Sequence, residues 1–284
     1  MRLKIFSVLV IITMMLICLT GCSSDGINQE DVNSVHTTST EDVKNTTEST
    51  NDTEEKESSS TRVVDTIDYE AAAKKQLAMP EKGDTVATIK VKGYGEIKVK
   101  FFEEVAPKAV ENFLTHAKEG YYDGLIFHRV MNEFMIQGGD PDGNGMGGES
   151  IWGTGFGTEL SYELVPYRGS LCMAMSSLPN SIGSQFFITQ ANYDEEIKDL
   201  LASANYPAGL INQYEKYGGY LSLYLQYTVF GQVYEGLDVL DKIANVKTKS
   251  VPLVINGVDY GTQDDKPVND VVIETIEITT YKEN

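Results

Sequence analysis

Apolar and polar side chains alternate in two neighbouring stretches of the chain, Thr85–Lys92 and Glu96–Phe102, which are separated by Gly93-Tyr94-Gly95. A period of two is typical of a strand with one buried face, and a glycine-rich break between two such stretches predicts a β-hairpin. Val271–Thr280 alternates in the same way. We therefore expect the folded part of the chain to begin with a hairpin and to close with a strand.

Two other stretches have helical spacing. After Pro107, apolar side chains recur three and four positions apart, and Gly120 follows them. Proline at the start and glycine just past the end of such a stretch predict an amphipathic helix. Leu237–Ala244 predicts a second helix.

The remaining apolar runs between residues 120 and 235 are short and separated by glycine. They are Leu125–Val130, Phe134–Gln137, Leu171–Met175, Gln185–Ile188 and Val229–Val233. Many short strands with glycine between them, together with two core helices, are typical of an antiparallel barrel. We predict a mainly β protein whose antiparallel strands close into a barrel capped by two helices.

The first 22 residues follow another pattern. Arg2 and Lys4 precede an apolar run that ends at Leu19, and small residues lead to Cys22. This is the layout of a secretory signal, and the apolar run is slightly short for a membrane-spanning helix. The tetrad Leu-Thr-Gly-Cys resembles the bacterial lipoprotein signal, which implies a signal peptide over residues 1–21 and a diacylated Cys22. We expect a lipid anchor on the extracytoplasmic face of a bacterial cell membrane.

Residues 22–81 form the next predicted unit. From Ser23 to about Asp65 the chain consists mainly of Ser, Thr, Asn, Asp and Glu without apolar periodicity, which predicts a disordered tether. Asp68–Met79 predicts a short helix before Pro80, to which we assign no function. We expect the folded domain to occupy residues 82–284, so that a chain starting near Lys82 folds on its own.

Composition excludes several classes of function. Lys and Arg number 23 against 42 Asp and Glu, so the formal net charge is −19, which disfavours binding to nucleic-acid phosphates. The cysteines, Cys18, Cys22 and Cys172, are too few for a disulfide framework. With three histidines and no Cys-x-x-Cys motif, the chain lacks the pattern of a structural zinc site. We expect no metal and no cofactor.

Three motifs carry a more specific resemblance. They are Phe127-His128-Arg129-Val130, the run FMIQGGD over residues 134–140, and the run SQFFIT over residues 184–189. In this order they resemble the cyclophilins, and the similarity extends from about residue 84 to 280. The resemblance implies an eight-stranded barrel with two capping helices, peptidyl-prolyl cis-trans isomerase activity and a substrate groove on the outside of the barrel. The bacterial lipoprotein cyclophilins are the branch that the chain resembles.

The chemistry of this reaction is consistent with the residues present. Amide resonance holds an Xaa-Pro bond planar behind a barrier of about 18–20 kcal/mol. Rotation breaks no covalent bond, so neither a nucleophile nor a metal is needed. A fixed donor aimed at the nitrogen binds the twisted amide better than the planar one. Arg129 suits this role because its guanidinium is always charged and carries several directed donors.

The resemblance also implies roles for other residues. It makes Arg129, Gln137 and His128 the catalytic group, with Gln137 orienting the arginine and His128 packing against the substrate. An apolar pocket must hold the proline ring. The implied substrate-binding residues are Phe134, Met135, Ala174, Gln185, Phe187, Leu223 and Tyr227. Taken singly, Phe134, Met135 and Phe187 fit plain barrel core better than a binding pocket, and it is the family match that favours the pocket.

The chain departs from the family pattern in two places. Where many cyclophilins have Trp-Leu-Asp-Gly-x-His, residues 222–227 read SLYLQY, so Ser222 replaces the tryptophan, Leu223 is retained and Tyr227 replaces the histidine. The missing indole implies weakened cyclosporin binding. Residues 191–221 are an insertion and predict two short helices joined at Tyr206-Pro207. The insertion either selects substrates or a partner, or is a solvated addition.

The leading hypothesis is therefore a monomeric, membrane-tethered prolyl isomerase that acts on Xaa-Pro segments of unfolded exported proteins and assists their folding. The alternative is a binding module with the same fold that binds Pro-containing segments without useful turnover, which the altered stretch Leu223–Tyr227 favours. A solute-capturing lipoprotein is disfavoured because the chain lacks two similar α/β lobes. A prolyl-peptide turnover assay separates the first two hypotheses.

Overall fold

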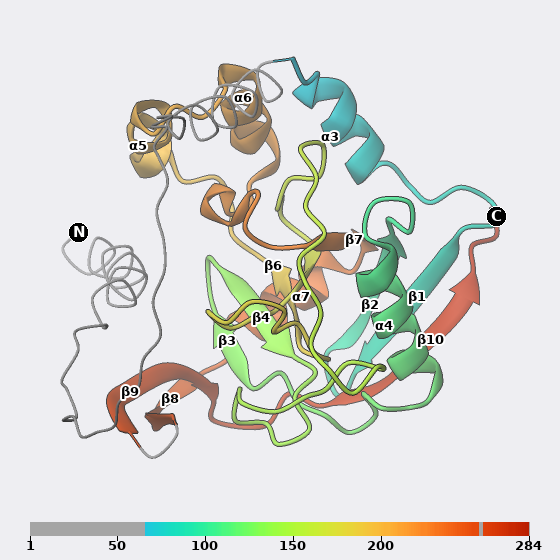
Figure 1. The fold of residues 1–284 in the computed structure, drawn as a ribbon, viewed down its shortest axis with the longest axis vertical. Helices are drawn as coiled ribbons and strands as arrows, with labels where there is room; N and C mark the ends of the chain where they lie inside the picture. The colour runs from blue at the N-terminus through green and yellow to red at the C-terminus, as the bar shows by residue number, and fades with distance from the viewer. Residues whose placement is uncertain (1–65, 256–257, 284) are drawn as a thin grey trace, which may run out of the picture. The chain divides into compact units, whose positions relative to one another are not determined.

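Eight strands join one antiparallel sheet in the computed structural model, which describes residues 66–255 and 258–283 (Figure 1). Their order is β10-β1-β2-β7-β5-β6-β4-β3, and every paired neighbour is antiparallel. The strands are β1 (Thr85–Val91), β2 (Gly95–Phe101), β3 (Arg129–Met131), β4 (Met135–Gly138), β5 (Ser170–Met173), β6 (Phe186–Thr189), β7 (Val229–Glu235) and β10 (Ile273–Thr280). The mainly β prediction is confirmed.

The ladder of hydrogen-bonded strands is not closed, so the predicted closed barrel is wrong on this point. β3 and β10 stand at the two ends of the strand order. The segment before β3 approaches β10 through an isolated bridge between Ile126 and Val272, and the Phe127 N–H donates to the Val271 carbonyl at 2.9 Å. β3 is only three residues long, so it is too short to continue this contact as a ladder.

The predicted first hairpin is present as β1 and β2. Ile89 pairs with Ile97, and both side chains are fully buried. Gly95 begins β2 with φ of 127°, and a side chain at this position would approach Val239 of α7 (Leu237–Ala244) to 3.1 Å. The turn therefore requires glycine both for its backbone conformation and for the space it leaves to the helix.

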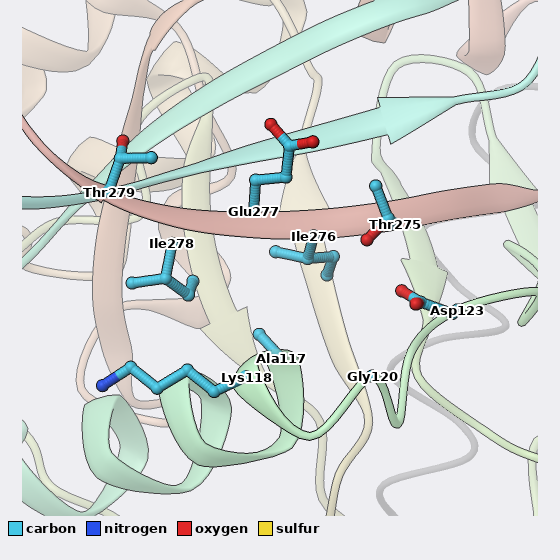
Figure 2. A pocket seen from close by; sticks show the side chains of 9 residues that line it. All are labelled: Ala117, Lys118, Gly120, Asp123, Thr275, Ile276, Glu277, Ile278 and Thr279. Atoms are coloured by element: carbon cyan, nitrogen blue, oxygen red, sulfur yellow. The ribbon is translucent and has the colours of Figure 1, made fainter.

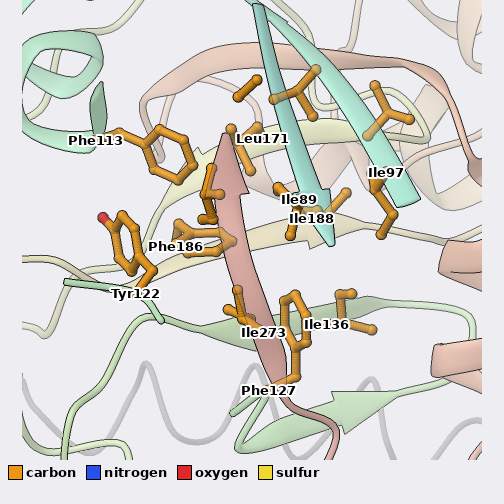
Figure 3. Packing of buried hydrophobic residues seen from close by; sticks show 14 of the residues in the cluster. Ile89, Ile97, Phe113, Tyr122, Phe127, Ile136, Leu171, Phe186, Ile188 and Ile273 are labelled. Atoms are coloured by element: carbon orange, nitrogen blue, oxygen red, sulfur yellow. The ribbon is translucent and has the colours of Figure 1, made fainter. Parts of the chain in front are cut away.

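The main core lies between one face of the sheet and two helices, α4 (Pro107–Lys118) and α7. Phe113 of α4 lies at its centre, with its ring 5.2 Å from those of Tyr122 and Phe186 and 5.4 Å from that of Phe230. Figure 3 shows Phe113, Tyr122 and Phe186 pointing toward one another. Both helices occur where their apolar spacing predicts them, and both bury that apolar face in the core.

A second apolar cluster joins α3 (Tyr69–Leu77), α5 (Lys198–Ser203) and α6 (Ala208–Tyr217), which lie together in Figure 1. α5 and α6 are the two helices predicted in the insertion. Short 3-10 turns at Glu195–Ile197 and Leu221–Leu223 flank them. Leu210 and Tyr214 of α6 are almost completely buried in this shared cluster, so the insertion is packed against the domain and is not merely a solvated addition.

α3 belongs to this folded unit, although the sequence analysis placed it in the tether. Tyr69, Ala73 and Gln76 are buried. The Gln76 side-chain amide donates to the Val165 carbonyl at 2.7 Å and its oxygen accepts from the Val165 N–H at 3.0 Å. The packed part of the chain therefore begins before the boundary expected near Lys82, because a polar side chain docks the helix and leaves no apolar signal.

Residues 248–255 and 258–267 form a second, two-stranded sheet that the sequence analysis missed. It consists of β8 (Thr248–Ile255) and β9 (Val258–Pro267). β9 contacts β3, and Figure 1 shows the hairpin beside that strand.

The predicted signal peptide, Cys22 and most of the predicted tether lie outside the described residues. Among the residues that are described, no helix has both the length and the apolar character that crossing a membrane requires.

Candidate active site

The strands of the main sheet send alternate side chains to opposite faces, and the face away from the main core carries most of the predicted site. On β4 and β6, Ile136 and Phe186 belong to the main core, whereas Met135 and Phe187 belong to a separate apolar cluster. We call this second group the pocket cluster. Its buried members are Met135, Leu164, Cys172, Phe187, Leu223 and Val229, and its partly buried members are Phe102, Val105, Met131, Phe134, Ala174, Tyr220 and Tyr227.

The pocket cluster brings together all the predicted substrate-binding residues except Gln185. Its floor is closed, since Met135 is 1% and Phe187 5% exposed. Its rim includes two half-buried aromatic rings: that of Tyr227, which meets Phe187 edge to face at 5.5 Å, and that of Phe134. An apolar floor with partly exposed aromatic rims can hold a small ring such as that of proline.

Arg129 extends from β3 to the edge of this cluster. Its Cζ atom lies 6.0 Å from the centroid of the Phe134 ring. Arg129 faces Gln137 in the β3–β4 register, and its Nη1 donates to Gln137 Oε1 at 3.4 Å. The structure thus places a charged, multi-donor group beside an apolar pocket.

A chain of side-chain amides continues from Gln137. Its Nε2 donates to Gln185 Oε1 at 2.9 Å, and Gln185 Nε2 donates to the Gly147 carbonyl at 2.7 Å. These bonds link β4 to the residue before β6 and then to the glycine-rich loop, residues 143–157. The two amides are therefore held in defined orientations, and Gln185 lies next to the pocket cluster rather than in it.

His128 is the predicted residue whose setting differs from the expectation. It is 3% exposed, so it offers little surface to a substrate. Neither ring nitrogen has a hydrogen-bond partner within the described residues. Burial lowers the pKa of His128 to about 4, and the nearby Asp140 carboxylate only partly opposes this shift. The imidazole is therefore neutral at pH 7 and lies close to the backbone of the loop at Gly145.

Two residues at the site were missed by the sequence analysis. Asp265 of β9 accepts a hydrogen bond from Arg129 Nε at 2.7 Å. Tyr220, at the end of the insertion, packs its ring against Phe134 with the centroids 4.4 Å apart. Asp265 is one acid among 42 Asp and Glu residues, and Tyr220 is one of 16 tyrosines, so neither had a signal in the sequence.

Another pocket lies between the end of α4 and β10 (Figure 2). Ile276 and Ile278 point from β10 toward Ala117 of α4, with Asp123 at one side. None of the predicted site residues lines this pocket. Within residues 66–255 and 258–283 there is also no group of three or more His, Cys, Asp or Glu side chains that could hold a metal ion.

Comparison with known proteins agrees with this geometry. The family model described as "Cyclophilin type peptidyl-prolyl cis-trans isomerase/CLD" matches residues 86–278. A Staphylococcus epidermidis protein named "Putative peptidyl-prolyl cis-trans isomerase" is 47% identical over 185 residues, which cover 65% of this chain and 87% of that protein. A relative with the same name in Staphylococcus saprophyticus is 44% identical over 204 residues, or 72% of this chain and 96% of that protein.

Solved structures give the same result. The crystal structure of a Cryptosporidium parvum cyclophilin-type peptidyl-prolyl cis-trans isomerase has a TM-score of 0.52 and 31% identity, and it covers 70% of this chain and 99% of its own. A structure obtained in the presence of the dipeptide ala-pro has a TM-score of 0.51 and 32% identity, with 69% of this chain and 99% of that chain covered. The sheet, the pocket cluster and the extended family match lead to one conclusion: the chain belongs to the cyclophilin-type peptidyl-prolyl cis-trans isomerases.

Proposed function

We propose that this isomerase twists Xaa-Pro bonds at the pocket cluster, with Arg129 as the residue that stabilises the twisted amide. The observation that carries this assignment is the position of the guanidinium, at the edge of an apolar pocket and beside Gln137. The proline ring would lie on Met135 and Phe187, between the half-buried rings of Phe134 and Tyr227.

In this mechanism the barrier falls through differential binding. A planar Xaa-Pro amide delocalises the nitrogen lone pair, whereas the twisted amide regains it. A donor from Arg129 can bond the lone pair only in the twisted form, so it lowers the energy of the transition state more than that of the ground state. The neutral His128 supplies no proton in this scheme.

The amides of Gln137 and Gln185 would bind the substrate backbone. Each is fixed by the bond between them, at 2.9 Å, and Gln185 is further fixed by the loop carbonyls of Gly145 and Gly147. The solved relative studied with ala-pro supports the choice of an Xaa-Pro peptide as the substrate class.

The test is turnover of an Xaa-Pro peptide by the purified full chain in detergent, measured with melting curves. Arg129→Ala should lower kcat/KM by roughly two to three orders of magnitude, about 3–4 kcal/mol of transition-state binding. Its Tm should fall, because the nearly buried Asp265 carboxylate loses its ion-pair partner. Arg129→Lys should recover little, since an ammonium cannot replace a planar set of donors.

Near-normal turnover by Arg129→Ala would overturn the catalytic assignment. A wild-type chain that binds Pro-containing peptides without accelerating their exchange would instead establish the alternative of a binding module. That alternative is favoured by the altered stretch Leu223–Tyr227, in which Tyr227 replaces the family's histidine.

The proposed place of action is the extracytoplasmic face of a bacterial membrane. The enzyme would work there as a monomer held by a lipid on Cys22 and assist the folding of exported proteins. The support is the basic start, the apolar run and the Leu-Thr-Gly-Cys tetrad of the first 22 residues. Cys22→Ala should leave an unprocessed precursor that carries no lipid label, detected by its mass and by labelled fatty acid. Normal cleavage and acylation of this variant would refute the anchor.

A further inference from the structure

The Nε atom of Arg129 is bound by the carboxylate of Asp265, a residue that belongs to none of the sequence motifs described above. Arg129 Nε donates to Asp265 Oδ2 at 2.7 Å, and the Asp265 side chain is only 12% exposed. The two residues are 136 positions apart in the chain. Their contact exists because β9 lies against β3, so it is a product of the β8–β9 hairpin.

The three nitrogens of the guanidinium have contacts of unequal strength. Nη1 donates to Gln137 Oε1 at 3.4 Å, which is long for a hydrogen bond. Nη2 lies 3.2 Å from Met131 Sδ, and a thioether is a weak acceptor. Only the Asp265 contact is both short and charge-assisted, and such bonds are roughly twice as strong as neutral ones. Asp265 is therefore the strongest restraint on the direction of the guanidinium.

The form of the contact decides which nitrogens face the pocket. Arginine often meets a carboxylate through two parallel bonds, which would engage a terminal nitrogen as well. Here the bond runs through Nε alone, and Asp265 Oδ1 has no hydrogen-bond partner within the described residues. Both terminal nitrogens are thus left on the side of Gln137 and Met131, next to the pocket cluster.

A purely structural role, docking of the hairpin, has another candidate. Lys266, the next residue of β9, donates from Nζ to the Gly143 carbonyl at 3.0 Å. This bond attaches β9 to the glycine-rich loop without involving Arg129. The two contacts can therefore be removed separately, which lets docking of the hairpin be distinguished from orientation of the arginine.

We propose that Asp265 is a positioning residue that fixes the Arg129 guanidinium with its terminal nitrogens toward the substrate. The inference rests on the proposed role of Arg129. Without Asp265 the side chain would sample rotamers that point the donors away from the pocket, so the fraction of enzyme poised for the twisted amide would fall while the pocket that binds proline stayed intact.

The experiment compares Asp265→Ala, Asp265→Glu and two matched controls in the full chain. NMR exchange measurements give the rate of cis/trans turnover and the affinity for an Xaa-Pro peptide as separate quantities. Tm is recorded for each variant. Asp265→Ala should lower kcat/KM about tenfold, mostly through kcat. Asp265→Glu should recover part of the loss because it restores the charged acceptor. Asp264→Asn, which removes an exposed acid from the same strand, and Lys266→Ala, which removes the other attachment, should retain wild-type kcat/KM.

A double-mutant cycle with Arg129→Ala supplies the decisive outcome. If Asp265 acts through Arg129, Asp265→Ala should change kcat/KM by less than about twofold in the Arg129→Ala background. An equal loss in both backgrounds, or a loss matched by Lys266→Ala, would overturn the inference in favour of hairpin docking. Unchanged activity in Asp265→Ala alongside a strong loss in Arg129→Ala would refute this inference alone, whereas an active Arg129→Ala would refute both.

Discussion

The two faces of strands β4 and β6 are made of similar side chains but differ in closure. On the inner face, Ile136, Phe186 and Ile188 are fully buried in the main core. On the outer face, Met135 and Phe187 are also buried, but the pocket cluster around them includes half-buried side chains such as Phe134 and Tyr227. Neighbouring residues of one strand thus belong to the main core and to the pocket cluster in turn, because alternate side chains point to opposite sides of the sheet.

This difference predicts how substitutions divide between stability and turnover. An inner-face side chain contacts only protein, so its loss is felt in the free energy of unfolding. An outer-face side chain has one side prepared for a ligand, so its loss is felt in catalysis and less in stability. Adjacent residues of β6 allow a direct comparison, since Phe186 and Phe187 have the same side chain on opposite faces.

Phe186→Ala should have the largest effect on stability. The ring is fully buried and meets those of Phe113 and Tyr122 edge to face at 5.2 and 5.4 Å. Its removal should cost about 3–5 kcal/mol of unfolding free energy through lost burial and the cavity left behind. Urea denaturation followed by tyrosine fluorescence measures this. A loss below about 1 kcal/mol would show that the inner face repacks easily.

Phe187→Ala should cost less stability than Phe186→Ala, near the lower end of about 3–5 kcal/mol, because its cavity opens toward the groove. Its turnover should nevertheless fall strongly, with KM for an Xaa-Pro peptide raised by loss of the pocket floor. The check is kcat and KM of the purified full chain beside its urea curve. If Phe187→Ala lost stability as Phe186→Ala does and kept the wild-type KM, the two faces would not differ as proposed.

His128 should make stability depend on pH in a defined window. Its pKa is lowered by burial from 6.5 to about 4 in the folded chain. Below pH 6.5 the unfolded chain therefore binds a proton that the folded chain does not, and the free energy of unfolding falls as pH drops toward 4. The expected loss between pH 7 and pH 5 is about 2 kcal/mol.

The variant His128→Gln isolates this contribution from those of other titrating groups. Urea curves at pH 7, 6 and 5 should show a shallower decline in the variant than in the wild type. Turnover of the wild type should stay flat between pH 6 and 8, because the imidazole remains neutral throughout. Parallel declines in the two proteins would mean that His128 is not the group responsible.

Tyr220→Ala should have the smallest of these effects. The residue supplies one aromatic wall beside Phe134 at 4.4 Å and contributes nothing to the main core. Loss of such a ring contact is worth about 1 kcal/mol, or roughly fivefold in kcat/KM. Tyr220→Phe should keep the wild-type value, and Ser222→Ala, an exposed position, serves as the control. Wild-type activity in Tyr220→Ala would show that the insertion does not contribute to the active site through this residue.

Much of the fold follows from local patterns in the sequence. Ile89 and Ile97 lie on the buried face that their alternation predicts, and the amphipathic stretch after Pro107 is α4. The pocket side chains come mainly from short motifs that a family match can locate. These predictions succeed because strand alternation and helical spacing report burial directly.

The remaining features depend on polar or long-range contacts. The β8–β9 hairpin contains Pro252, Gly261 and several acids, so its alternation is weak. Gln76 docks α3 through hydrogen bonds, in addition to the burial of Tyr69 and Ala73. The role of Asp265 is visible only from its contact with Arg129, which lies on the main sheet. None of these contacts produces a repeating pattern of apolar residues in the sequence. The prediction of a closed barrel was wrong because closure depends on the length of β3.

The pairing of β1 with β10 has a consequence for the order in which the chain can fold. Thr85 lies opposite Thr280, and the ladder continues to Ile89 opposite Ile276. The first strand of the sheet therefore acquires its second neighbour from the last one. A nascent chain released as far as Asp270 has an unpaired edge at β1 and lacks Ile273 and Ile276 from its core. Contacts of such long sequence separation slow folding, and the sheet can be completed only after β10 has been synthesised.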